Sequence, residues 1–117
     1  MAQRLREAQM RVLGQAAKVA LRDRMEASLR EFWPELSAEL DEESAMEEFL
    51  GKAIQSCERY GLTAEADHFR YLNVMALLGA EFDSKYGWAA EVLAQASRRG
   101  SSRMDEVCEL AAGQAVA

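Results

Sequence analysis

The chain has 117 residues, half of them hydrophobic, with a net charge of −6 and one proline. This length favours a single domain, 1–117, with enough apolar content for a packed core without disulfides or bound metal. Nucleic acid is disfavoured as a partner, because phosphate binding needs a sustained positive surface.

The charge is distributed unevenly along the chain. Residues 1–30 contain seven basic and three acidic side chains, which gives +4, whereas residues 31–60 contain two basic and nine acidic ones, which gives −7. The densest part is residues 35–48, which hold seven carboxylates and no base: Glu35, Glu39, Asp41, Glu42, Glu43, Glu47 and Glu48. The simpler interpretation is a solvated connection, and the functional one is an acidic docking surface around Glu42 and Glu43.

Scarce glycine, proline and β-branched residues predict an all-α fold. We expect a small helical bundle of four to five helices, with a long N-terminal helix, 3–33, and a helical core, 43–112. Apolar residues recur at helical spacing in the first segment: Leu5, Met10, Leu13, Ala17, Leu21, Met25, Leu29 and Phe32. About 30 residues span ~45 Å, more than a domain of this size needs. The long helix is therefore a candidate arm for a partner or for a second copy in a homodimer.

Trp33-Pro34 is expected to end the long helix, because proline restricts the residue before it and cannot donate a backbone hydrogen bond. Membrane binding through this helix is disfavoured, since its apolar face is rich in alanine and only Phe32 and Trp33 suit an interface. The sequence also lacks the apolar run of a signal peptide or a membrane-spanning helix. We therefore expect a cytoplasmic protein.

The core is predicted to contain helices over 43–60, 64–78, from Trp88 onward, and over 103–112. Gly61 is expected to end the first of these in a left-handed conformation, and Thr63 to cap the next. The helix 64–78 is apolar over much of its circumference, so we expect it at the centre of the bundle. Residues 80–87 are expected to form a loop, and residues 113–117 to fray.

Few residues suggest catalysis or metal binding. Glu65 and His68 have the Glu-x-x-His spacing of di-iron bundles, but a complete site needs two such motifs and this chain has one histidine. The simpler reading is a helix-capping Glu65 and a half-exposed His68. Cys57 and Cys108 are interpreted as reduced apolar residues rather than nucleophiles, and a disulfide between them would require that their two helices touch. We therefore expect no enzyme activity, no catalytic residues, no cofactor and no metal.

Aromatic residues near the middle of the chain allow two interpretations. Phe69 and Leu72 are expected in the core. Arg70, Tyr71 and Trp88 could lie in the core or anchor a protein interface, since tyrosine, tryptophan and arginine are common in interface hot spots. Together with Glu42 and Glu43, these three are the candidate protein-binding residues.

One stretch resembles a known family. The run Tyr60-Gly61-Leu62-Thr63-x-Glu65-Ala66-Asp67-x-x-Arg70-Tyr71-Leu72-Asn73, then Leu78-Gly79-x-x-Phe82-Asp83, then Trp88-Ala89-x-x-x-Leu93, is similar to small bacterial helical co-chaperones encoded with type VI secretion effectors. The resemblance covers residues 57–94. It implies a non-enzymatic protein that binds an effector chaperone and regulates effector loading or release. An immunity protein that neutralises a toxin is the alternative, because high acidity complements basic toxins.

Overall fold

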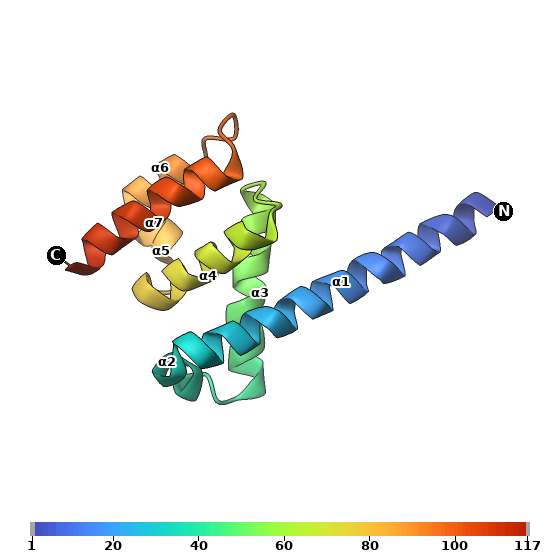
Figure 1. The fold of residues 1–117 in the computed structure, drawn as a ribbon, viewed down its shortest axis with the longest axis horizontal. Coiled ribbons are helices and arrows are strands. Elements are labelled where there is room, and N and C mark those ends of the chain that lie inside the picture. The colour runs from blue at the N-terminus through green and yellow to red at the C-terminus, as the bar shows by residue number, and fades with distance from the viewer. Residues whose placement is uncertain (1, 117) are drawn as a thin grey trace.

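The computed structural model describes the backbone of residues 2–116 and the side chains of Gln9 and residues 14–116. Every regular element in this part of the chain is a helix, in agreement with the predicted all-α fold. The helices are α1 (Ala2–Phe32), α2 (Pro34–Glu39), α3 (Glu43–Arg59), α4 (Glu65–Leu78), α5 (Phe82–Lys85), α6 (Gly87–Leu93) and α7 (Gly100–Val116). Figure 1 shows α1 as a long rod that extends away from the other helices.

Several predicted boundaries were wrong. The expected loop 80–87 contains α5, and the acidic segment 35–48 contains most of α2, so the bundle has two short helices more than predicted. The last helix begins at Gly100 and continues to Val116, through the end that was expected to fray. The spacing of apolar residues did not predict α2 and α5, because helices of six and four residues are too short to show a helical period.

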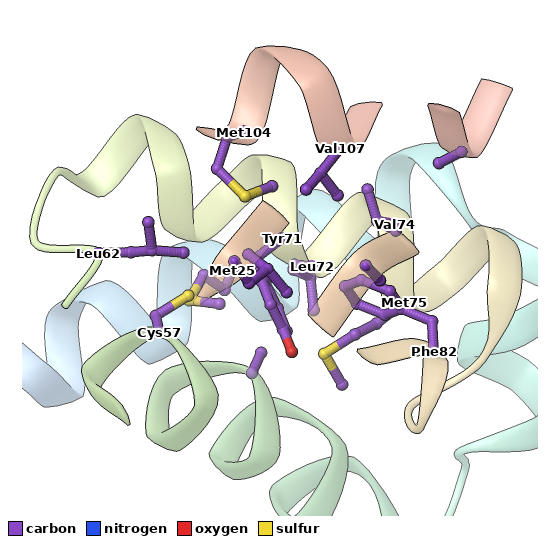
Figure 2. Packing of buried hydrophobic residues seen from close by; sticks show 14 of the residues in the cluster. Met25, Cys57, Leu62, Tyr71, Leu72, Val74, Met75, Phe82, Met104 and Val107 are labelled. Atoms are coloured by element: carbon purple, nitrogen blue, oxygen red, sulfur yellow. The ribbon is translucent and has the colours of Figure 1, made fainter. Parts of the chain in front are cut away.

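Helix α4 lies at the centre of the bundle, as its apolar sequence predicted. It packs against α1, α3, α5 and α7. Tyr71, Leu72 and Met75 of α4 are almost completely buried among side chains of its neighbours (Figure 2). The ring of Tyr71 lies 4.9 Å from that of Phe82 in α5, centroid to centroid. Burial of these large side chains between α4 and its four neighbouring helices stabilises the core, because it removes apolar surface from water.

Among the described side chains of α1, those that join the core lie in its C-terminal half. Met25 and Leu29 are buried there, whereas residues 14–20 are all exposed. The radius of gyration, 15.8 Å, exceeds the about 13 Å of a compact chain of this length, as a projecting helix requires. Basic residues of α1 face acidic ones of α3 and α4: Lys18 pairs with Glu58 at 3.0 Å, Arg24 with Glu65 at 2.7 Å, and Arg22 with Glu47.

The chain reverses from α3 into α4 through a Schellman motif. Gly61 has a φ of 72°, its N–H donates to the carbonyl of Glu58 at 3.1 Å, and the N–H of Leu62 donates to that of Cys57 at 2.8 Å. Leu62 is buried beside the motif, which fixes the turn to the core. Gly61 therefore ends α3 as predicted. Thr63 does not cap α4: the N-cap is Ala64, and no side chain caps this helix end.

Two buried polar groups hold the C-terminal end of α3. The Arg103 guanidinium of α7 donates to the carbonyl oxygens of Tyr60 at 2.7 Å and Leu93 at 2.8 Å. These carbonyls lie at the ends of α3 and α6, where backbone acceptors lack helical partners and positive charge is favoured. The Asp83 carboxylate of α5 accepts hydrogen bonds from Arg59 and the Tyr60 hydroxyl, each at 2.7 Å. Both contacts join segments distant in sequence.

Replacing Arg103 by methionine should destabilise the fold by about 3 kcal/mol, because it removes two charge-assisted hydrogen bonds and leaves two buried carbonyls without donors. Urea unfolding followed by circular dichroism would measure the loss. Arg99→Met is the matched control, since Arg99 is exposed and loses no such contact. Equal stability of the two variants would contradict the role given to Arg103.

Gly79→Ala should destabilise the protein by about 1–3 kcal/mol. Gly79 ends α4 with φ 105° and ψ 158°, a backbone region that essentially only glycine occupies. Gly51 has helical geometry within α3, and a methyl group added there would meet no neighbouring side chain within 4 Å. Gly51→Ala should therefore stabilise the protein by up to about 1 kcal/mol. The two substitutions should therefore change the stability of the protein in opposite directions, which thermal unfolding of both variants would measure. A gain in stability for Gly79→Ala would refute the conformational argument.

Candidate protein-binding groove

Helices α1 and α2 meet at a corner with a single residue between them. Trp33 leaves helical geometry, with φ −131° and ψ 59°, and Pro34 starts α2 at its first position, where no backbone N–H is required. The N–H of Trp33 still donates to the carbonyl of Leu29 at 2.8 Å, and the N–H and hydroxyl of Ser37 donate to the carbonyl of Trp33. The Trp33-Pro34 pair therefore ends α1 as predicted. No loop follows, because the next helix, α2, begins at Pro34 itself.

A groove of about 430 Å³ lies at this corner, between α2 and α4. Its lining residues come from the end of α1, from α2 and from α4: Phe32, Trp33, Pro34, Glu35, Leu36, Glu39 and Ala76. Phe32 is 67% exposed, unusual for so large an apolar side chain. The indole N–H of Trp33 donates to Asn73 Oδ1 of α4 at 3.1 Å, which fixes the ring to the groove wall. The groove thus combines apolar surface with a positioned aromatic ring.

The rim of the groove is acidic and lacks counterions. Glu35 and Glu39 line the groove, Asp41 and Glu42 follow in the turn, and Glu43 begins α3. Asp41 and Glu43 line a separate hollow, together with Arg22 and Arg30 of α1. These five carboxylates are exposed, and none forms an ion pair with any side chain among residues 14–116. By contrast, Glu47, Glu58 and Glu65 are paired with basic residues of α1. An acidic rim around an apolar groove fits a ligand that is apolar with flanking positive charge.

The predicted protein-binding residues do not form one site. Arg70 lies where α4 meets α7, and pairs with Asp67 at 2.7 Å and with Asp105. Trp88 is half-buried with its ring 5.6 Å from that of Tyr86. Glu42 and Glu43 lie at the start of α3, the end beside α2 (Figure 1).

Tyr71 is fully buried, so its assignment as a binding residue was wrong. Its ring fills the space between α4 and α5, where no partner can reach it. Leu72 lies in the core as expected, and Phe69 is partly buried against it. Neither tyrosine nor tryptophan can be assigned to core or interface from sequence, since both occur in both.

The sequence interpretation overlooked the lining residues from α2 and α4, namely Leu36 and Ala76. A signal was present in the adjacent aromatic pair Phe32-Trp33 at a helix end, followed by proline. The sequence did not predict that α4 lies beside this corner, because that arrangement results from packing between segments distant in the chain.

The Glu65 and His68 pair does not form the start of a metal site. His68 is buried rather than half-exposed, and its protonated Nδ1 donates to the carbonyl of Ala64 at 2.9 Å. Glu65 pairs with Arg24 instead of capping its helix. Among the residues whose side chains are described, no three His, Cys, Asp or Glu residues lie close enough to hold a metal ion. Within the same residues, no helix is long and apolar enough to cross a membrane.

Both cysteines are free thiols, consistent with the predicted reduced state. Cys57 is buried in the core, and burial raises its pKa to about 12. Cys108 is half-buried in α7, and burial raises its pKa as well. Raised pKa values leave little thiolate at neutral pH, which disfavours a nucleophilic role.

Comparison of the chain with protein-family models, curated proteins and solved structures finds no match.

Alkaline pH should destabilise the protein through Cys57. The thiol of an unfolded chain loses its proton near pH 9, whereas the folded thiol keeps it until about pH 12. Between these values only the unfolded state releases the proton, so stability falls as the pH rises, by up to roughly 4 kcal/mol. Urea unfolding at several pH values from 7.5 to 11 would measure the slope. Cys57→Ala should reduce it, and an unchanged slope in that variant would exclude this cause.

Proposed function

We propose that this chain is a non-enzymatic co-chaperone that binds a type VI secretion effector chaperone in the cytoplasm and regulates effector loading or release. The observation that carries the proposal is the apolar groove at the α1–α2 corner with its unpaired acidic rim. The resemblance of residues 57–94 to co-chaperones of this class supports the choice of partner.

The groove has the composition of a recognition surface. Its volume, about 430 Å³, suits a few side chains of a partner rather than a whole domain. Phe32 provides a large exposed apolar contact, and the hydrogen bond between Trp33 and Asn73 holds a second aromatic ring in place. Fixed aromatic side chains lose little conformational entropy on binding.

Charge determines which segment of the chaperone the groove would take. Glu35 and Glu39 lie on the rim and pair with no basic side chain among residues 14–116, so a segment with lysine or arginine beside apolar residues would be favoured. An amphipathic helix with a basic edge has this composition. We therefore propose a basic amphipathic segment of the chaperone as the ligand of the groove.

The first experiment is a pull-down from the native bacterium with the tagged full chain, followed by mass spectrometry. Recovery of an effector chaperone supports the proposal. Recovery of a toxin without a chaperone, together with inhibition of that toxin by the purified chain, would support the alternative of an immunity protein. The acidity of the chain is the observation that keeps this alternative open.

Two variants then locate the binding surface by calorimetry with the recovered chaperone. The double charge reversal Glu35→Lys/Glu39→Lys should weaken binding at least tenfold, because it replaces attraction at the rim by repulsion. Phe32→Ala should weaken it tenfold or more, as for an interface hot spot. The matched controls are Glu91→Lys/Glu109→Lys and Leu110→Ala, which change exposed residues of α6 and α7 in the same way. Equal losses in variants and controls would place the binding surface elsewhere.

A further inference from the structure

Trp33 is held at the α1–α2 corner through both its backbone and its side chain. Its N–H donates to the carbonyl of Leu29, and its carbonyl accepts hydrogen bonds from the N–H and the hydroxyl of Ser37. The side chain is fixed separately, because the indole N–H donates to Asn73 Oδ1 of α4 at 3.1 Å. Asn73 therefore sets the position of the aromatic ring that lines the groove.

The chemistry of the indole determines how the Asn73 amide is oriented. An indole N–H can only donate a hydrogen bond, so the carboxamide must present its oxygen to Trp33. The NH2 group of the amide keeps both of its donors, and neither is used by any group among residues 14–116. Asn73 is exposed, so these donors are accessible to a ligand.

The amide of Asn73 lies on the side of α4 that faces the groove. Ala76, three residues later, lines the groove, and residues three or four apart are neighbours on a helix surface. Leu77, four residues after Asn73, is 42% exposed. The unused donors therefore stand beside apolar surface, and the opposite side of the groove carries the carboxylates of Glu35 and Glu39 on α2.

We propose that Asn73 is the specificity-determining residue of the groove: its amide oxygen positions Trp33, and its NH2 group donates to a free carbonyl oxygen of the bound segment. This inference rests on the basic amphipathic segment proposed above as the ligand. Without such a donor the groove would recognise only apolar surface and positive charge. A hydrogen bond to a carbonyl adds a requirement on the backbone of the ligand.

The position of this donor also orients the ligand. In a helix only the last four carbonyls lack an intrahelical partner, so the C-terminal turn of the bound segment lies at Asn73. That turn carries partial negative charge, which disfavours a position over Glu35 and Glu39. The lysine or arginine side chains that these two carboxylates attract therefore precede the C-terminal turn in the ligand.

Exchange of the Trp33 indole N–H with solvent, measured by NMR on the full chain without ligand, tests the positioning role. Trp33 gives the indole signal that persists in Trp88→Phe. Exchange should be about fivefold or more faster in Asn73→Leu, and unchanged in Asn73→Asp, which keeps an acceptor. Gln55→Leu is the matched control, since it removes an exposed amide from α3. Equal exchange rates in the native chain and Asn73→Leu would overturn the positioning role.

Calorimetry with a synthetic peptide tests the donor role. The probe is an acetylated and amidated peptide of leucine, alanine and lysine, about 15 residues long, with one apolar face and lysine along its edges. Asn73→Asp should bind it about fivefold or more weakly than the native chain, because a carboxylate repels a carbonyl oxygen and donates no hydrogen bond to it. Charge alone predicts the opposite sign, since the substitution adds negative charge near a basic ligand.

Gln55→Glu is the control for this substitution, because it makes the same change of amide to carboxylate at an exposed position of α3 and should leave the affinity unchanged. Equal or tighter binding of the peptide by Asn73→Asp would refute the donor role. Peptide binding that depends on Asn73, with no chaperone recovered from the bacterium, would contradict the co-chaperone proposal and support the role of Asn73. A native chain that does not bind the peptide would overturn both the ligand proposed for the groove and the role of Asn73.

Discussion

The contact of Arg103 with the carbonyl oxygens of Tyr60 and Leu93 connects α7 with the C-terminal ends of both α3 and α6. One buried guanidinium on α7 satisfies acceptors at the ends of both α3 and α6, where the helical hydrogen-bond pattern stops. Tyr60 also immediately precedes Gly61 in the Schellman motif that ends α3. The orientation of α4 relative to α3 therefore depends on the same residue that Arg103 contacts. Helix α4 in turn packs against α1, α3, α5 and α7.

This dependence explains what the most distinctive stretch of the chain does. Tyr60 and Arg59 donate to buried Asp83, Gly61 takes the left-handed conformation, and Arg70 pairs with Asp67 and Asp105. Tyr60, Gly61, Asp67, Arg70 and Asp83 belong to the stretch on which the proposal of a co-chaperone is based, and in this structure they serve the connections between helices. Apart from Asn73, which contacts Trp33, the resemblance therefore concerns the scaffold, and partner recognition is expected from exposed surfaces.

One such surface lies at the corner between α1 and α2. The groove there combines the exposed Phe32, the positioned Trp33 ring and the carboxylates of Glu35 and Glu39. A chain built only for its own stability would have no need of an exposed phenylalanine or of a helix that extends beyond the core.

The sequence by itself determined the helical class, the approximate extents of the long helices and the turn at Gly61. These follow from local causes: helix propensity, apolar spacing, and a glycine that can adopt a left-handed conformation. Only the tertiary structure decided that Tyr71 lies in the core, that His68 is buried, and that α2 and α5 form in segments without a clear helical period. It also brought Ala76 beside Phe32 and Leu36, and placed Arg103 between two helix ends. These outcomes depend on contacts between residues some 10 to 45 positions apart, whose pairing leaves no signal in the local pattern.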